Sequence, residues 1–182
     1  MFVYVSGRRC LDFAGTLKQR DSGREELLTQ PECLSDWGVQ AGLLDTPIDV
    51  TDNDLTAAIA LREATYRTVI SRLDGRGLRP ADVALINEWG AQPRLTPRLH
   101  RSGSVSREGS AAQLLASLVA DLLDLLGDAE MDNVKRCAHA GCTRLYLDSS
   151  RAKNRHWCGM STCGNRAKVQ AFRARQRAAD QK

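Results

Sequence analysis

Apolar residues recur at helical spacing in four segments of this 182-residue chain. Spacings of three and four residues place such side chains on one face of a helix. Pro, Thr or Ser at the first turn and Gly near the last turn mark where a helix begins and ends. The pattern therefore predicts four helices, over residues 31–43, 51–75, 80–90 and 110–127.

The fourth of these segments, Ser110–Gly127, is apolar over more than one stripe. A helix that is apolar on several sides is normally buried, so we expect it at the centre of the core. The segment is too short to span a membrane, and Asp121 and Asp124 add charge to it. A coiled-coil dimer helix is the alternative, but the chain lacks the sustained heptads that a coiled coil requires.

The β content is expected to be small. Phe2–Val5 and Cys10–Ala14 are short runs that favour β-structure, and they predict a hairpin or two short strands. Residues 93–107, with Gly103 among turn-forming residues, predict a hairpin or a loop. The fold class is thus mainly α with small β elements (α+β), with a helical domain over residues 1–130. Asp128–Asn133 is interpreted as the linker to a second unit.

Four cysteines in the last third of the chain form two C-x4-C pairs separated by fifteen residues, Cys137, Cys142, Cys158 and Cys163. Two short loops that each donate two thiolates are typical of a structural zinc site. We therefore predict one structural Zn²⁺, with no position left for a catalytic water. His139 and His156 lie near the pairs and are alternative ligands, although the set of four thiolates is complete without them.

The zinc unit over residues 134–182 divides into a loop carrying the first pair, a predicted hairpin over 145–157, and a helix from about residue 167 to 179. Cys163 is expected at the start of that helix, where free amide groups stabilise thiolate charge. This order is treble-clef-like. Trp157 is expected to pack under the metal site.

Charge divides the chain sharply. Residues 135–182 hold twelve Lys and Arg against two acidic residues, a net charge of +10, while residues 1–134 hold fourteen against twenty, a net charge of −6. Such asymmetry indicates that the zinc unit meets a polyanion. If Val169 and Phe172 face the zinc hairpin, the basic residues of the helix are left exposed. The candidate DNA contacts are Arg151, Lys153, Arg155, Asn165, Arg166, Lys168, Arg173, Arg175 and Arg177. Asn165 and Arg166 have an alternative task, to cap the helix and brace the zinc loop. A solvated basic helix that meets no partner is the alternative for the whole set.

Other classes of protein find less support. The chain has three histidines, no phosphate-binding glycine loop and no recognisable pair of catalytic carboxylates, so we expect no enzyme. It has no signal-peptide-like start and no run long enough for a membrane span, which predicts a cytoplasmic protein with no membrane partner. Cys10 and Cys33 are expected to be small residues of the core rather than nucleophiles.

The residues of the zinc unit also resemble a known family. Cys163-Gly-Asn-Arg166, preceded by Arg155-His-Trp-Cys-Gly-Met160, is similar to the CGNR zinc finger. Cys10-Leu-Asp-Phe-Ala-Gly-Thr16 and Leu34-Ser-Asp-Trp37 resemble the ABATE domain that accompanies this finger in bacterial stress-induced transcription regulators. The resemblance implies zinc ligation by the four cysteines, DNA binding by the finger and a regulatory first domain. Gly15 departs from the family, which tends to have asparagine there.

Three functions follow from these observations. The favoured one is a zinc-containing, DNA-binding transcriptional regulator whose first domain senses a small-molecule effector or mediates assembly. The alternatives are a protein-interaction adaptor, in which the finger is a scaffold for the basic helix, and an RNA-binding module. Because one small finger offers limited contact area, we expect a homodimer or a tandem site.

Overall fold

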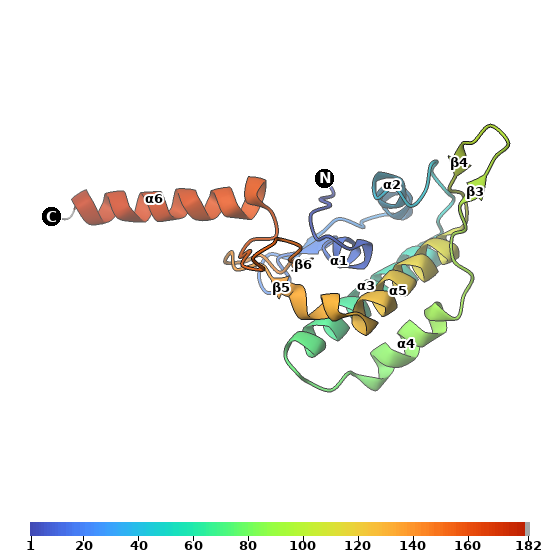
Figure 1. Cartoon of the computed structure of the whole chain (residues 1–182), viewed down its shortest axis with the longest axis horizontal. Coiled ribbons are helices and arrows are strands. Elements are labelled where there is room, and N and C mark those ends of the chain that lie inside the picture. Colours follow the sequence, from blue (N-terminus) through green and yellow to red (C-terminus); the bar gives the residue numbers. More distant parts are fainter. Residues whose placement is uncertain (181–182) are drawn as a thin grey trace.

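A computed structural model describes residues 1–180, with the side chains at positions 171, 174, 175 and 178–180 left out (Figure 1). The α+β class is confirmed, because about 49% of the chain is helical and the strands are short. The helices are α1 (Arg9–Ala14), α2 (Pro31–Gln40), α3 (Asp52–Leu73), α4 (Pro80–Gly90), α5 (Ala111–Gly127) and α6 (Asn165–Asp180). A 3-10 helix covers Ala129–Asn133 and a π-helical turn covers Met160–Gly164.

The described strands form three two-stranded antiparallel sheets. They are β1 (Leu17–Lys18) with β2 (Glu25–Glu26), β3 (Arg98–Leu99) with β4 (Val105–Ser106), and β5 (Val134–Arg136) with β6 (Leu145–Leu147). No helix among residues 1–180 is long and apolar enough to cross a membrane.

The four helices predicted from the apolar pattern are confirmed, and local chemistry explains where they begin. Pro31 and Pro80 each occupy the first turn of a helix. Thr51 and Asp54 form a capping box at the start of α3, and Ser110 and Gln113 form another at the start of α5. Each capping box satisfies two backbone groups that would otherwise lack partners.

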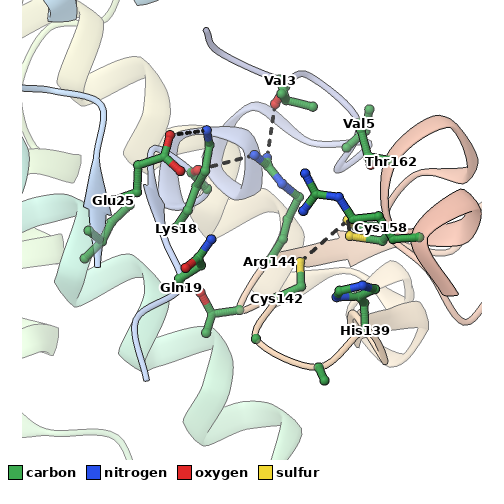
Figure 2. Close-up of a pocket in the computed structure, with 17 residues that line it drawn as sticks. Val3, Val5, Lys18, Gln19, Glu25, His139, Cys142, Arg144, Cys158 and Thr162 are labelled. Carbon is green, nitrogen blue, oxygen red and sulfur yellow. Dashed lines mark hydrogen bonds and ion pairs between the residues drawn. The ribbon is translucent and has the colours of Figure 1, made fainter. Parts of the chain in front are cut away.

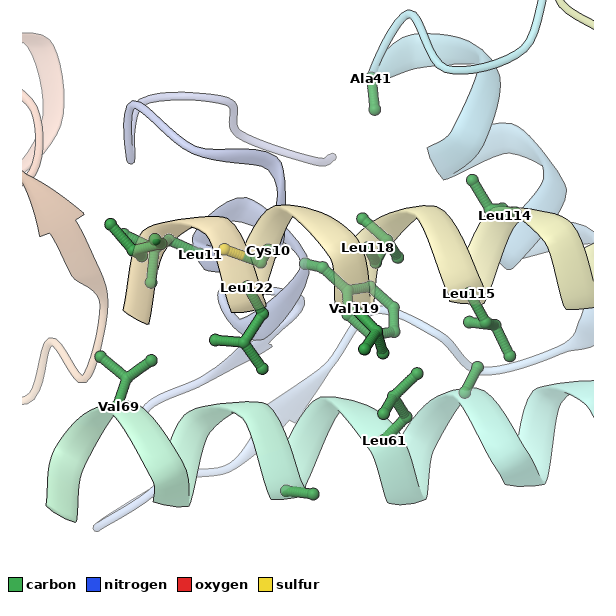
Figure 3. Close-up of a cluster of buried hydrophobic side chains, with 14 of the residues drawn as sticks. Cys10, Leu11, Ala41, Leu61, Val69, Leu114, Leu115, Leu118, Val119 and Leu122 are labelled. Carbon is green, nitrogen blue, oxygen red and sulfur yellow. The ribbon is translucent and has the colours of Figure 1, made fainter. Parts of the chain in front are cut away.

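Helix α5 lies at the centre of the main core, as its composition predicts. Figure 3 shows α5 running beside α3, with Leu61 and Val69 of α3 turned toward it. The buried face of α5 packs on α1, α3 and α4, which leaves no apolar seam for a coiled coil on that face. Its fully buried side chains are Leu114, Leu115, Leu122 and Leu125.

The predicted amino-terminal strands are wrong. Residues 2–5 pair with no strand in the described chain, and Cys10–Ala14 forms most of α1. Every residue from Cys10 to Ala14 is buried, so the segment carries no helical period that a sequence pattern could reveal. Asp12 accepts hydrogen bonds from the backbone N–H groups of Val5 and Ser6 at 3.0 and 2.9 Å and so anchors the preceding chain to the helix. Cys10 is buried as expected, and Cys33 is half-buried.

The hairpin expected within residues 93–107 is present, with Leu99 opposite Val105 and Gly103 in the left-handed conformation at φ +84°. Residues 129–133, interpreted as a linker, form a 3-10 helix instead of an extended connection. Met131 within it is buried in the main core. The chain is therefore tied to the helical domain up to the point where the finger begins.

The hairpin predicted over residues 145–157 is also wrong. Strand β6 pairs with β5, which precedes it, in the register Val134 with Leu147 and Arg136 with Leu145. Because side chains alternate along a strand, β6 faces two cores. Leu145 and Leu147 join the main core, while Tyr146 packs against the cysteines.

Helix α6 projects away from the rest of the molecule, as Figure 1 shows. Val169 and Phe172 were expected to pack on the zinc hairpin, but they are 47% and 53% exposed. That prediction is wrong because α6 continues straight from the π-helical turn and does not fold back over the finger.

Candidate metal centre and nucleic-acid interface

The first pair of cysteines lies on the loop that joins β5 to β6. Cys137 follows β5 directly, and its N–H donates to the carbonyl of Arg144 at 3.0 Å. The N–H of Cys142 donates to the carbonyl of His139 at 3.0 Å, and Gly141 turns the chain with φ +78°. Glycine adopts this left-handed conformation at little cost. The loop thus presents both sulfur atoms to one side.

The second pair lies at the start of the last helix, as predicted. Cys158 precedes the π-helical turn and Cys163 is within it, so Cys163 is continuous with α6. A Cβ atom at Gly164 would lie 2.8 Å from the Met160 sulfur and 3.4 Å from the Trp157 ring, so a larger residue there would require the Met160 side chain to move. Trp157 packs against the cysteine cluster, which agrees with its predicted structural role.

The four sulfur atoms all lie within 4.8 Å of one another. Cys158 and Cys163 are 3.6 Å apart, and Cys142 and Cys158 are 3.9 Å apart, so these contacts are not disulfide bonds. A Zn–S distance of about 2.3 Å in a tetrahedron requires sulfur atoms about 3.8 Å apart. The donor set therefore fits one structural zinc held by Cys137, Cys142, Cys158 and Cys163, and neither His139 nor His156 belongs to it.

The thiol pKa values show why this cluster calls for a cation. Hydrogen bonds from the thiols of Cys142 and Cys158 lower the pKa of Cys137. The hydrogen bond with Cys137 in turn raises the pKa of Cys142 to about 11 and raises that of Cys158 further. Ionisation of one thiol thus disfavours ionisation of its neighbours, whereas a bound divalent cation stabilises all four thiolates together.

Sequence reasoning missed the carboxylate that organises the loop after β6. Asp148 is fully buried and accepts hydrogen bonds from Lys135 Nζ at 2.7 Å, Ser150 Oγ at 2.6 Å and the N–H of Arg155 at 2.9 Å. The hydrogen bond from Lys135 holds the pKa of Asp148 far below its usual range. The signal was available, since Asp148 is the only acidic residue in positions 134–179.

Arg155 was predicted to contact DNA, and the structure assigns it a different task. Its guanidinium donates to the carbonyls of Trp157 at 2.7 Å, Val5 at 3.3 Å and Cys158, and it lies 4.6 Å over the Tyr146 ring. A guanidinium with these partners holds the zinc loop to the amino-terminal segment. We therefore remove Arg155 from the set of direct phosphate contacts, because binding a phosphate would cost these bonds.

The other candidate contacts fall into two groups. Arg151 and Lys153 are exposed on the loop after β6, where Lys153 Nζ also donates to the Asp148 carbonyl at 3.0 Å. The second group is exposed along the projecting helix and comprises Asn165, Arg166, Lys168, Arg173 and Arg177. The side chain of Arg175 lies outside the described residues, as do residues 181 and 182. Asn165 Nδ2 donates to the Ser161 carbonyl at 3.5 Å, which is consistent with the alternative that Asn165 braces the zinc loop.

A pocket of about 390 Å³ opens where the helical domain meets the finger (Figure 2). Its walls come from Val3 and Val5, from β1 and β2, from the first cysteine loop and from the start of α6. His139 lines it, and the Nε2 atom of that residue is buried without a hydrogen-bond partner in the described structure. Cys142, Cys158 and Cys163 also line it, so a bound zinc ion would take up part of this volume, and the remainder would be open to a small ligand.

Arg144 crosses this junction from the finger into the helical domain. Its Nη1 donates to the Val3 carbonyl at 3.1 Å and lies 3.8 Å from Asp12 Oδ1, and its Nη2 donates to the Gly15 carbonyl at 3.3 Å. A Cβ atom at position 15 would lie 2.3 Å from Nη1. The absence of a side chain at Gly15 therefore makes room for Arg144.

Comparison with known families agrees with this architecture. Residues 7–129 match the ABATE model, described as "Putative stress-induced transcription regulator", and residues 133–176 match the CGNR zinc finger model. No curated protein matches the chain. The ABATE match covers well over half of the chain, and the four predicted zinc ligands all lie within the CGNR match. The chain therefore belongs to the ABATE family and carries a carboxyl-terminal CGNR zinc finger.

Proposed function

We propose that this protein is a DNA-binding transcriptional regulator of the bacterial cytoplasm, without enzymatic activity. The observation that carries the proposal is the placement of α6, which projects from the zinc site with basic side chains exposed along it. A 16-residue helix is about 24 Å long, and an α-helix fits the major groove of B-DNA. Exposed Arg and Lys supply the phosphate contacts that dominate DNA affinity.

Zinc has a structural role in this proposal. Bound by the four thiolates, it fixes the first cysteine loop to the first turns of the last helix. Cys163 lies in the π-helical turn that continues into α6, so the metal site sets the direction in which α6 leaves the finger. Arg144 and Arg155 then fix the finger to the amino-terminal segment.

The junction pocket supports the sensing part of the proposal. A ligand there would touch the helical domain through Leu17 and Lys18 and the finger through Thr143 and Arg166. Arg166 lies in the first turn of α6, so occupancy would act directly on the base of the DNA-contacting helix. This arrangement suits a small-molecule effector that changes the orientation of α6.

The proposal is tested by selecting duplexes from a random-sequence pool and measuring their affinity by fluorescence anisotropy over a range of salt concentrations. About four phosphate contacts from α6 predict a log–log salt slope of about −4. The R173Q/R177Q variant should weaken binding and flatten the slope. R94Q/R98Q, which removes two exposed arginines, one before β3 and one within it, is the matched control and should leave the slope unchanged. Affinity that does not depend on salt would contradict the proposal.

One observation favours the adaptor instead. Met160, Val169 and Phe172 expose apolar side chains on the π-helical turn and α6, and phosphates do not recognise such groups. If the protein binds no DNA duplex at low salt and binds no RNA from a pool of hairpins, the adaptor function is preferred. Retention of RNA in place of DNA would support the RNA-binding alternative.

Assembly is part of the same proposal. A single finger buries limited area on DNA, so we propose that two copies bind together. Sedimentation velocity with and without the selected duplex tests this. A single copy of the protein on each duplex, both with protein in excess and with duplex in excess, would contradict it.

A further inference from the structure

A second concave surface, which none of the four cysteines lines, lies on the finger where the end of α3 meets β5 and the loop after β6. This groove of about 560 Å³ is lined by Leu73, Asp74, Val134, Lys135, Arg136, Ala138, Tyr146, Lys153, Asn154, Arg155 and His156. We call it the β5 groove. Lys135 and Arg136, which belong to it, were absent from the DNA contacts predicted from sequence.

The charges of the β5 groove are unbalanced. Lys135, Arg136 and Lys153 are its cationic lining residues available to an anion, and Asp74 is its only lining carboxylate. Arg155 also lines the groove, but its guanidinium is bound to backbone carbonyls. The buried Asp148 carboxylate partly offsets the positive charge of the groove. It also positions the Lys135 side chain, because Lys135 Nζ donates to it at 2.7 Å. Lys153 Nζ donates to the Asp148 carbonyl at 3.0 Å. The Lys135 and Lys153 side chains are thus held in place before a ligand arrives, which lowers the entropy cost of binding.

The single lining carboxylate comes from the helical domain. Asp74 follows the last residue of α3 and pairs with Arg136 of β5 and with Arg76. The side chains of Asp74 and Arg136 are 28% and 49% exposed, so water and solutes reach the pair. Exposed ion pairs contribute little to stability, and a phosphate group can replace the carboxylate as the partner of Arg136.

We propose that the β5 groove binds the phosphate backbone of duplex DNA and that Asp74 competes with the phosphate for Arg136. The inference rests on the proposed function and adds a second contact, distinct from α6. It also gives the helical domain a direct means to lower DNA affinity, because the competing carboxylate is attached to α3. Displacement of α3 from the finger would release Arg136 to the DNA.

The decisive variant is Asp74→Asn, which removes the competing charge and keeps the side-chain shape. It should raise DNA affinity about threefold to tenfold and steepen the log–log salt slope by about one phosphate contact. Asp52→Asn is the matched control, because Asp52 is an exposed acid at the opposite end of α3, about 32 Å away. At that distance salt screens its charge from the groove, so affinity should stay the same.

Arg136→Gln should weaken binding and flatten the slope by about one contact. In the double variant D74N/R136Q the gain from D74N should disappear, since the group that it releases is absent. An equal gain in D74N and D52N, or a gain that persists in the double variant, would overturn the inference while leaving DNA binding intact. Absence of DNA binding by the wild-type protein and by D74N alike would overturn the proposed function as well. Zinc content and circular dichroism confirm that each variant is folded.

Discussion

In the helical domain, α5 and its neighbours bury a continuous set of apolar side chains, including Trp37 and Phe13. In the finger, the described buried cluster contains Tyr146 and three cysteines, with Val5, Cys142 and Trp157 at its edge. The first region carries its own core, whereas the second combines four thiolates, one buried carboxylate and a strand shared with its neighbour. The stability of the finger therefore depends both on zinc and on its contacts with the helical domain.

Loss of zinc should have the largest effect, and it should separate the two regions. In Cys163→Ser the finger should unfold, because zinc binding supplies about 10–16 kcal/mol of folding energy in small zinc peptides. Metal analysis and circular dichroism measure the loss, and the helices of the first domain should remain. Cys33→Ser, at a half-buried cysteine outside the zinc site, is the control. A C163S protein that stays fully folded without zinc would contradict the structural role of the metal.

The shared strand offers the next test. Leu145 belongs to the finger by sequence but is buried in the main core. Leu145→Ala should therefore destabilise the helical domain by about 2–5 kcal/mol, the usual cost of truncating a buried leucine. Urea unfolding followed by far-UV circular dichroism reports mainly on that domain, because α1 to α5 belong to it. Leu123→Ala, at a 41% exposed leucine of α5, should change little. Equal effects of the two variants would show that β6 contributes nothing to the main core.

The Arg144 contact can be tested by the residue that makes room for it. Gly15→Ala should cost about 1–3 kcal/mol, because its Cβ would lie 2.3 Å from Arg144 Nη1 and force the side chain to move. In the Arg144→Ala background, the same substitution should cost much less. The double-mutant cycle is measured by thermal unfolding. Additive costs would mean that the guanidinium does not occupy this space.

The last test concerns the pH dependence of stability at Asp148, where Asp148→Asn keeps the side-chain shape and one acceptor. The pKa of the folded carboxyl is depressed, so its stabilisation is fully present above about pH 4, the unfolded value. It is lost as pH falls toward the lower folded pKa. The wild-type protein should therefore be more stable than D148N at pH 7, and the difference should shrink below about pH 4. Thermal unfolding of both proteins across this range measures it, and a difference independent of pH would contradict the assignment.

Much of the architecture was predictable because it depends on local signals. The capping residues Thr51 and Ser110 and the periodic leucines specify α3 and α5 without reference to the rest of the chain. The zinc ligands were predictable for a similar reason, since the spacing of each cysteine pair is determined by a short loop. The wrong predictions concern segments whose structure depends on residues far away in the sequence. Strand β6 pairs with β5 across the first cysteine loop, and α1 is buried on all sides and shows no period.

Composition and short-range spacing were sufficient to predict the main helices, the four thiolates and the division into an acidic and a basic part, because these features depend on neighbouring residues alone. Which basic residues are available to a partner depends on contacts between distant segments, and these contacts exist only in the folded chain. Arg144 and Arg155 look like the other arginines in sequence, yet backbone carbonyls of the amino-terminal segment accept their hydrogen bonds. The availability of a charged group depends on the partners that surround it, and the carbonyls of Val3 and Val5 lie 141 and 150 positions away along the chain from Arg144 and Arg155.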